Sequence, residues 1–215
     1  MKFRFVAVEG PIGVGKSSLA DLLAGRSGAV KVLERIENPF LRDFYKEKPG
    51  AAFQAQLFFL LNRYMQQQEL AQSDLFHQVT ICDYLFAKDK IFAYLNLTDS
   101  ELLIYEKLYG LLAEKVPQPD LVIYLQAGTE VLLERIRRRK RDYETEIAES
   151  YLNDLNQAYN YFFYHYTATP LLVINTSEID FVHRESDLDD LVSQIDGMNR
   201  GVQYYTPLGA GKGTR

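Results

Sequence analysis

The sequence predicts an α/β fold in which a five-stranded parallel sheet has helices on both faces. Three observations lead to this prediction. Short, continuous apolar runs, which are typical of strands buried on both faces, recur along the chain. Segments with helical periodicity separate these runs, and prolines fall in the connections. Such an alternation is typical of a doubly wound sheet, in which ligands bind beyond the carboxyl ends of the strands.

The expected strands are the five apolar runs. The first precedes a glycine-rich segment, and the last follows Pro170. They cover residues 3–8, 30–33, 79–82, 121–125 and 171–174. The expected helices cover residues 16–25, 51–72, 88–96, 100–115, 129–139, 146–167 and 185–195.

Composition limits the classes of function. A net charge of -5 leaves no surplus of Lys and Arg to bind a polyanion, so we expect no nucleic-acid partner. The single cysteine, Cys82, cannot form an internal disulfide, and no apolar run approaches the roughly 20 residues that cross a bilayer. Since the first residues also lack a secretory signal, we expect a cytoplasmic enzyme with no membrane partner.

The stretch GPIGVGKSS, which follows the first expected strand, fits the phosphate-loop pattern G-x-x-x-x-G-K-[ST]. Its backbone N–H groups and the following helix N-terminus would bind phosphate, Lys16 would add a charge, and Ser17 would offer a hydroxyl to Mg²⁺. We therefore expect a nucleoside triphosphate bound with Mg²⁺. The residues expected to bind it, as the ATP site if ATP is the donor, are Gly10, Pro11, Ile12, Gly13, Val14, Gly15, Lys16, Ser17 and Ser18. A similar stretch, GAGKGTR at residues 209–215, has no room for a following helix and is interpreted as part of a flexible tail.

Two polar residues share one face of the expected helix 51–72. Gln56 and Arg63 lie seven residues apart, which returns to nearly the same face after two turns, with Phe59 and Leu60 between them. Such a surface could bind a flat base by hydrogen bonds to its edge. From the spacing alone, a core helix with two polar residues is an equally good interpretation.

Several stretches together identify a family. The chain resembles the deoxynucleoside kinases from about Phe3 to Ile195. The stretches that carry the resemblance are GPIGVGKSSL, LERIENPF, FYKEKPGAAFQAQLFFLLNR, PDLVIYL, RIRRRKRDYE and YLNDLNQAY. The resemblance implies a P-loop kinase fold with an Arg-rich lid. It also implies transfer of the γ-phosphoryl group of ATP to the 5′-hydroxyl of a deoxynucleoside, in nucleotide salvage.

The resemblance assigns roles by position. It implies Glu34 as the base for the 5′-hydroxyl, and Lys16, Arg135 and Arg139 as catalytic cations. Arg138 would contact ATP, and Asp83 would bind Mg²⁺ with Ser17. The implied substrate-binding residues are Glu34, Tyr45 and Glu144 at the sugar, and Gln56, Arg63, Asp89 and Phe92 at the base. These residues favour deoxyadenosine, deoxyguanosine or deoxycytidine over thymidine, with a purine preferred.

The chain departs from the family pattern after the third apolar run. The relatives have an acidic residue, then Arg, then Ser, whereas this chain reads Asp83-Tyr84-Leu85. We expect Lys88 or a lid arginine to replace the missing positive charge. The departure also leaves two alternatives open: a nucleotide-binding sensor that no longer transfers phosphate, and a nucleoside monophosphate kinase.

The expected organisation is one kinase domain over residues 1–197, followed by a flexible tail over residues 198–215. Relatives dimerise through long helices. We therefore expect a homodimer formed through residues 51–72 and 100–115, although core packing would explain the same apolar residues.

Overall fold

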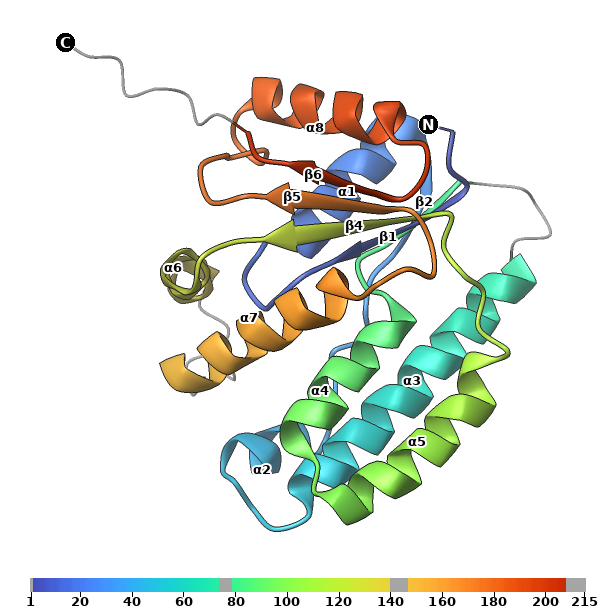
Figure 1. Cartoon of the computed structure of the whole chain (residues 1–215), viewed down its shortest axis with the longest axis vertical. Coiled ribbons are helices and arrows are strands. Elements are labelled where there is room, and N and C mark those ends of the chain that lie inside the picture. Colours follow the sequence, from blue (N-terminus) through green and yellow to red (C-terminus); the bar gives the residue numbers. More distant parts are fainter. Residues whose placement is uncertain (1, 74–78, 140–146, 208–215) are drawn as a thin grey trace.

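A six-stranded, fully parallel sheet forms the centre of the molecule (Figure 1). The computed structural model describes residues 2–73, 79–139 and 147–207. The strand order is β2-β3-β1-β4-β5-β6. The strands are β1 (Phe5–Glu9), β2 (Val30–Val32), β3 (Thr80–Cys82), β4 (Leu121–Gln126), β5 (Leu171–Asn175) and β6 (Val202–Tyr205).

The five predicted strands are confirmed, but the predicted number of strands is wrong. The sixth strand, β6, lies within the segment that the sequence analysis interpreted as a flexible tail, and it pairs with β5 from Leu171↔Val202 to Ile174↔Tyr205. Its pattern is weak because it is an edge strand in which Val202 and Tyr204 are exposed. Backbone pairing with β5 places this strand, and composition does not reveal it.

Helices cover both faces of the sheet, as predicted (Figure 1). The seven predicted helices are present, and two short elements, α2 and η2, were not predicted. The helices are α1 (Lys16–Ser27), α2 (Leu41–Tyr45), α3 (Ala51–Ser73), η2 (Phe86–Lys88, a 3₁₀ turn), α4 (Asp89–Asn96), α5 (Asp99–Ala113), α6 (Thr129–Arg139), α7 (Glu149–Tyr164) and α8 (Glu185–Gly197). Helix α5 begins at a capping box, in which Thr98 and Glu101 exchange hydrogen bonds.

Alternate side chains of the strands enter two cores. Val6, Val8 and Ile123 pack on the face covered by α1 and α8, where Leu19 and Leu191 are fully buried. Ala7 and Tyr124 point to the opposite face, which α4 and α7 cover. Burial on both faces explains why the central strands read as continuous apolar runs.

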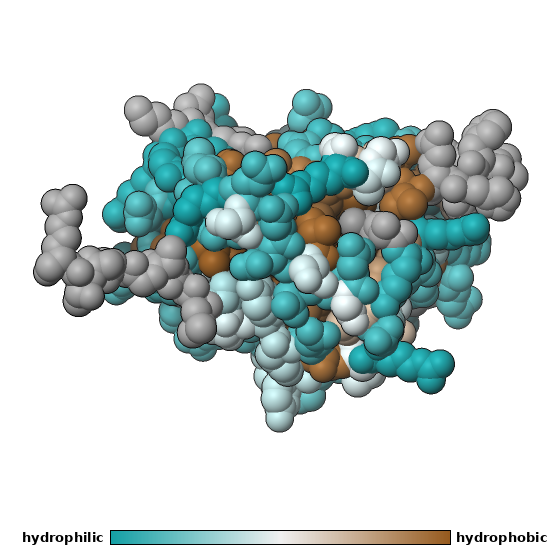
Figure 2. All heavy atoms as spheres, turned by 90° about the horizontal axis from the view of Figure 1, so that it is seen from above, coloured by the Kyte–Doolittle hydropathy of each residue, from teal (hydrophilic) through white to brown (hydrophobic). Residues whose placement is uncertain are grey.

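The outer surfaces differ in polarity. Seen from above, the molecule is mainly hydrophilic, with small hydrophobic areas between polar side chains (Figure 2). By contrast, α5 exposes Leu103, Ile104 and Leu111. None of the helices in the described part of the chain combines the length and the apolar character needed to cross a bilayer.

Candidate active site

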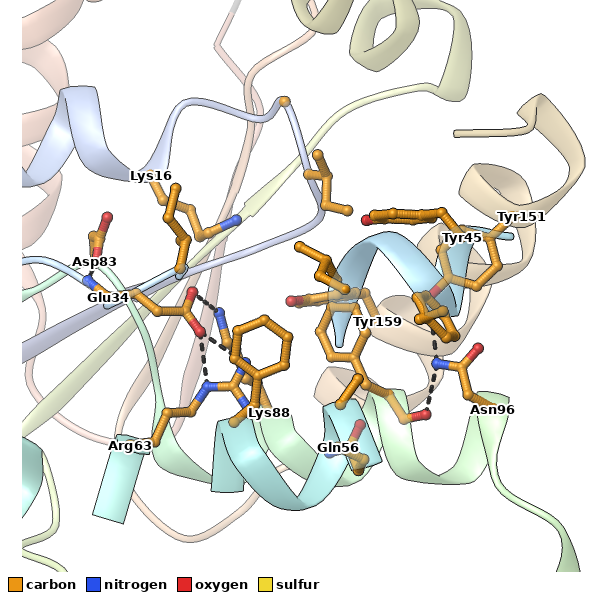
Figure 3. A pocket seen from close by; sticks show the side chains of 18 of the residues that line it. Lys16, Glu34, Tyr45, Gln56, Arg63, Asp83, Lys88, Asn96, Tyr151 and Tyr159 are labelled. Carbon is orange, nitrogen blue, oxygen red and sulfur yellow. Dashed lines mark hydrogen bonds and ion pairs between the residues drawn. The ribbon is translucent and has the colours of Figure 1, made fainter. Parts of the chain in front are cut away.

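A cavity of about 340 Å³ lies where β1, β2 and β3 end (Figure 3). Residues from α2, α3, α4 and α7 close its sides. It lies at the carboxyl edge of the sheet, where the predicted fold places a ligand. Its lining includes Lys16, Ser17, Glu34, Tyr45, Gln56, Phe59, Arg63, Asp83, Lys88, Phe92, Asn96, Arg139, Tyr151 and Tyr159.

The glycine-rich loop that joins β1 to α1 borders this cavity through Ile12 and Gly13. Glycine is required at two positions of the loop. A Cβ at Gly10 would lie 2.5 Å from the Leu125 carbonyl oxygen, and Gly13 has a φ of +87° and would place a Cβ 2.9 Å from the Leu132 carbonyl oxygen. The loop is therefore held tightly between β4 and α6.

Lys16 begins α1 and folds back over the glycine-rich loop. Its Nζ donates hydrogen bonds to the carbonyl oxygens of Gly10 at 2.7 Å and Pro11 at 3.2 Å. Burial lowers the pKa of Lys16, and the positive charge of Lys88 acts in the same direction against the opposing charge of Glu9. An anion in the cavity would therefore meet an ammonium group that is partly desolvated and already oriented.

Asp83 links the ends of three strands. Its Oδ2 accepts a hydrogen bond from the Ser17 hydroxyl at 2.5 Å, and its Oδ1 accepts one from the Glu34 backbone N–H at 2.6 Å. Ser17 and Asp83 offer the hydroxyl and carboxylate oxygens that Mg²⁺ prefers, so these residues fit a magnesium site. No group of three or more His, Cys, Asp or Glu side chains in the described residues could hold a metal, so phosphate and water oxygens would have to complete the shell.

Glu34 lies between two buried cations, as Figure 3 shows. Its Oε1 accepts hydrogen bonds from Arg63 at 2.7 Å, and its Oε2 accepts one from Lys88 Nζ at 2.6 Å. Burial on its own would raise the pKa of Glu34, but the charges of Lys88 and Arg63 outweigh it and lower that pKa to about 2. The carboxylate is therefore ionised at neutral pH and fixed at both oxygens.

Asp89 lies at the centre of a second polar cluster. It is fully buried, and its Oδ1 accepts hydrogen bonds from Gln56 Nε2 at 2.5 Å and from the Tyr105 hydroxyl at 2.8 Å, while its Oδ2 pairs with Arg63. Burial raises the pKa of Asp89, with Arg63 opposing. Gln56 and Arg63 line the cavity, but Asp89 does not. In this structure Asp89 orients these two side chains from behind.

Aromatic side chains form the apolar walls. Phe59 lies under the guanidinium of Arg63, with the Arg63 Cζ 4.9 Å from the ring centroid. Phe92 meets Tyr159 edge to face at a centroid distance of 6.1 Å. Tyr45, at the end of α2, lines the same cavity. A flat, largely apolar ligand with polar edges would fit these walls and the two clusters.

The predicted arginines are divided between different environments. Arg139 lines the cavity, and Arg138 is exposed at the end of α6. Arg135 is absent from the cavity lining, since its guanidinium donates to the Val14 carbonyl at 3.2 Å and to the Thr176 carbonyl at 2.7 Å. Burial lowers the pKa of Arg135. The predicted sugar ligand Glu144 and the stretch 209–215 lie outside the described residues.

The sequence analysis missed several polar residues at or beside this site, among them Glu9, Asn96, Tyr151 and Tyr159. Glu9, the last residue of β1, is fully buried and accepts hydrogen bonds from the backbone N–H groups of Gly10 and Leu85, both at 2.8 Å. Tyr159 on α7 donates to Glu9 at 3.1 Å. A carboxylate that ends an apolar strand and precedes a glycine-rich loop is a signal that could have identified Glu9. No such signal marks Tyr159, because its position fits the apolar face of an ordinary amphipathic helix.

Comparisons with known proteins agree with this architecture. The family model for deoxynucleoside kinase matches residues 6–199. A deoxyguanosine kinase of Bacillus subtilis is 36% identical over 197 residues, and the match covers 89% of this chain and 95% of the relative. A deoxyadenosine kinase of Dictyostelium discoideum is 33% identical, and the match covers 94% of this chain and 83% of the relative. A solved structure of deoxyadenosine kinase from M. mycoides with bound dATP superimposes with a TM-score of 0.76 at 25% identity and covers 89% of this chain and 98% of that one. On the strength of the matched family model and these relatives, the chain belongs to the deoxynucleoside kinase family.

Proposed function

We propose that this kinase transfers the γ-phosphoryl group of ATP to the 5′-hydroxyl of a deoxynucleoside, with Mg²⁺. The observation that carries the proposal is the shared cavity: the glycine-rich loop with Lys16, and the ionised carboxylate of Glu34, border the same space. Phosphoryl transfer depends mainly on positioning and on neutralising charge, and this cavity offers both.

ATP would bind through its phosphates to residues 10–18. Lys16 would exchange its hydrogen bonds to the Gly10 and Pro11 carbonyls for phosphate oxygens. Ser17 and Asp83 would hold Mg²⁺, which neutralises phosphate charge when bound. Arg138 and Arg139 are the candidate lid cations, whereas the contacts of Arg135 suit a residue that positions the loop.

Glu34 would accept a hydrogen bond from the attacking hydroxyl. The hydroxyl oxygen bonds to the γ-phosphorus while the bond from that phosphorus to the β–γ bridging oxygen breaks, which releases ADP. A carboxylate with a pKa near 2 is a weak base for a free alcohol. It can take the proton once the new O–P bond has made that proton acidic, and then pass it to solvent. Glu34 therefore first orients the attacking hydroxyl and accepts its proton only later in the reaction.

The remaining residues would hold the nucleoside. Tyr45 and Glu144 are proposed at the sugar, Gln56 and Arg63 at the base edge, and Phe92 at the base face, with Asp89 acting through Gln56 and Arg63. The candidate bases are adenine, guanine and cytosine. Relatives named deoxyguanosine kinase and deoxyadenosine kinase favour a purine.

A screen tests the proposal. The protein is incubated with ATP, Mg²⁺ and each of the four deoxynucleosides or their ribose counterparts, and ADP and the nucleoside monophosphate are quantified by chromatography. We expect monophosphate from at least one purine deoxynucleoside and much less from its ribose counterpart. Glu34→Gln should lower kcat by about 100-fold or more, whereas Glu37→Gln, at an exposed position, should not.

The same screen, extended to nucleoside monophosphates as acceptors and to a measurement of ATP binding, distinguishes the alternatives. Turnover only with nucleoside monophosphates would identify a nucleoside monophosphate kinase. ATP binding without turnover on any acceptor would identify a sensor. Equal rates with ribonucleosides would contradict the roles proposed for Tyr45 and Glu144 at the sugar.

We also propose a homodimer formed through α3 and α5, which pack against each other. Leu61 and Met65 are half exposed one turn apart on α3. Ile104 and Leu111 are exposed two turns apart on α5. Exposed apolar rows on two adjacent helices suit burial against a second copy of the chain.

A further inference from the structure

Lys88 is a buried lysine at the catalytic end of the cavity. Its side chain is 4% exposed, and its Nζ lies 2.6 Å from Glu34 Oε2 and 3.8 Å from Glu9 Oε2. Burying an ammonium group costs free energy unless the group is paired and hydrogen-bonded. The two carboxylates provide that pairing, so the position of Lys88 is tied to the position of Glu34.

Lys88 and Arg63 pair with different oxygens of the Glu34 carboxylate. Arg63 occupies Oε1 through its Nε and terminal nitrogen, while Lys88 occupies Oε2. With one cation on each oxygen, the plane of the carboxylate is fixed. Arg63 also pairs with Asp89, whereas the Nζ of Lys88 also lies 3.8 Å from Glu9 Oε2.

Tyr84, the residue that follows Asp83, contributes no charge to the cavity. Its side chain is fully buried and lines a separate, smaller space with Gln67 and Tyr109. The 3₁₀ turn η2, closed by a 3.1 Å hydrogen bond from the Lys88 N–H to the Leu85 carbonyl, instead brings Lys88 into the cavity. The positive charge at Oε2 of Glu34 therefore comes from Lys88, four positions further along the chain than Tyr84.

We propose that Lys88 is a positioning residue for phosphoryl transfer: it holds Oε2 of Glu34 so that this carboxylate keeps a fixed orientation toward the acceptor hydroxyl. The inference rests on the proposed function. It assigns the charge to η2 and not to the arginines of α6.

The test compares Lys88→Met, Lys88→Gln and Lys88→Arg with Lys90→Met as the matched control. Lys90 lies two residues along the chain, with its Nζ 4.7 Å from the ring centroid of Tyr109, and does not line the cavity. We expect Lys88→Met and Lys88→Gln to lower kcat by at least about 10-fold, or about 1.4 kcal/mol, with the deoxynucleoside KM changed by less than about 3-fold. Lys88→Arg should recover most of the loss, and Lys90→Met should match the wild type.

The division of the effect between kcat and KM, together with its recovery in Lys88→Arg, separates positioning from a merely structural role. An unchanged kcat in Lys88→Gln, or a Lys88→Arg variant as slow as Lys88→Gln, would overturn the proposal.

A second measurement does not depend on turnover. In protein with ¹³C-labelled glutamate carboxyl groups at neutral pH, the Glu34 resonance should move in Lys88→Gln and stay in place in Lys90→Met. If the wild type phosphorylates no nucleoside, the proposed function fails, but this comparison still decides whether Lys88 holds the Glu34 carboxylate. A Glu34 resonance that Lys88→Gln leaves unmoved would overturn the inference by itself.

Discussion

Ser17 and Asp83 lie 66 residues apart in sequence, yet the Ser17 hydroxyl donates to the Asp83 carboxylate at 2.5 Å. The other oxygen of Asp83 accepts the backbone N–H of Glu34 at 2.6 Å. One carboxylate thus connects the segments that follow β1, β2 and β3. It ties the proposed phosphate and magnesium groups to the residue that would orient the acceptor.

Asp83→Asn should lower the apparent affinity of the enzyme for Mg²⁺. The amide removes a negative oxygen from the proposed metal site, so we expect the Mg²⁺ concentration for half-maximal activity to rise by about 10-fold. The measurement is initial rate against free Mg²⁺ at saturating ATP. Asp154→Asn, at an exposed position of α7, is the control. Equal Mg²⁺ dependence in both variants would exclude Asp83 from the metal site.

Gly13→Ala should damage the glycine-rich loop. Its added Cβ would lie 2.8 Å from Ile136 Cγ1, in a backbone conformation with a φ of +87°. We expect a loss of about 1–3 kcal/mol in the free energy of unfolding and weaker ATP binding. Urea denaturation and calorimetric titration with ATP would measure these effects.

Gly25→Ala is the matched substitution in α1, where an added Cβ meets nothing within 4 Å. Because alanine favours a helix over glycine, it should raise the free energy of unfolding by about 0.5–1 kcal/mol. ATP affinity should stay at the wild-type value. If both variants bound ATP equally well, the loop would not be the phosphate site.

Glu34 should link stability to pH. Its pKa is lowered from its ordinary value of 4.5 to about 2 in the folded state, so the folded state binds this proton less readily than the unfolded state. The stabilisation is complete above the unfolded pKa and is lost as the pH falls from about 4.5 toward 2. Glu34→Gln should therefore be less stable than the wild type at pH 7, and the difference should shrink on acidification.

Urea titrations of both proteins between pH 6 and pH 3 would follow this difference. The difference between the two free energies of unfolding at each pH removes the contribution of the carboxyl groups that both proteins share. A difference that stayed constant across the series would show that the Arg63 and Lys88 pairing does not control the ionisation of Glu34.

Replacing Ile104 and Leu111 together by Glu should dissociate the proposed dimer. Charge on the exposed face of α5 would oppose its burial against a second copy. Light scattering after size exclusion should show the mass fall from two chains to one. Tyr161→Glu, at an exposed site on α7, should leave the mass unchanged. A wild-type protein with the mass of one chain would contradict the dimer directly.

Local sequence patterns were sufficient for much of this architecture. The continuous run Val6-Ala7-Val8 predicts a buried strand because both its faces are covered, and the Gly-Lys-Ser sequence predicts the turn into α1. The spacing of Gln56 and Arg63 predicts that they share a face, and both line the cavity. These features depend on backbone periodicity and glycine sterics, which act within a few residues.

The tertiary structure decided the features that depend on residues distant in sequence. β6 forms because it pairs with the exposed edge of β5. Asp89 lies behind Gln56 because Arg63 and Tyr105 enclose its side chain. Lys88 reaches Glu34 only because β2 and β3 are neighbours in the sheet. The sequence alone determined the fold class and the candidate residues. Their pairing was decided by packing and charge neutralisation between segments that meet only in the folded chain.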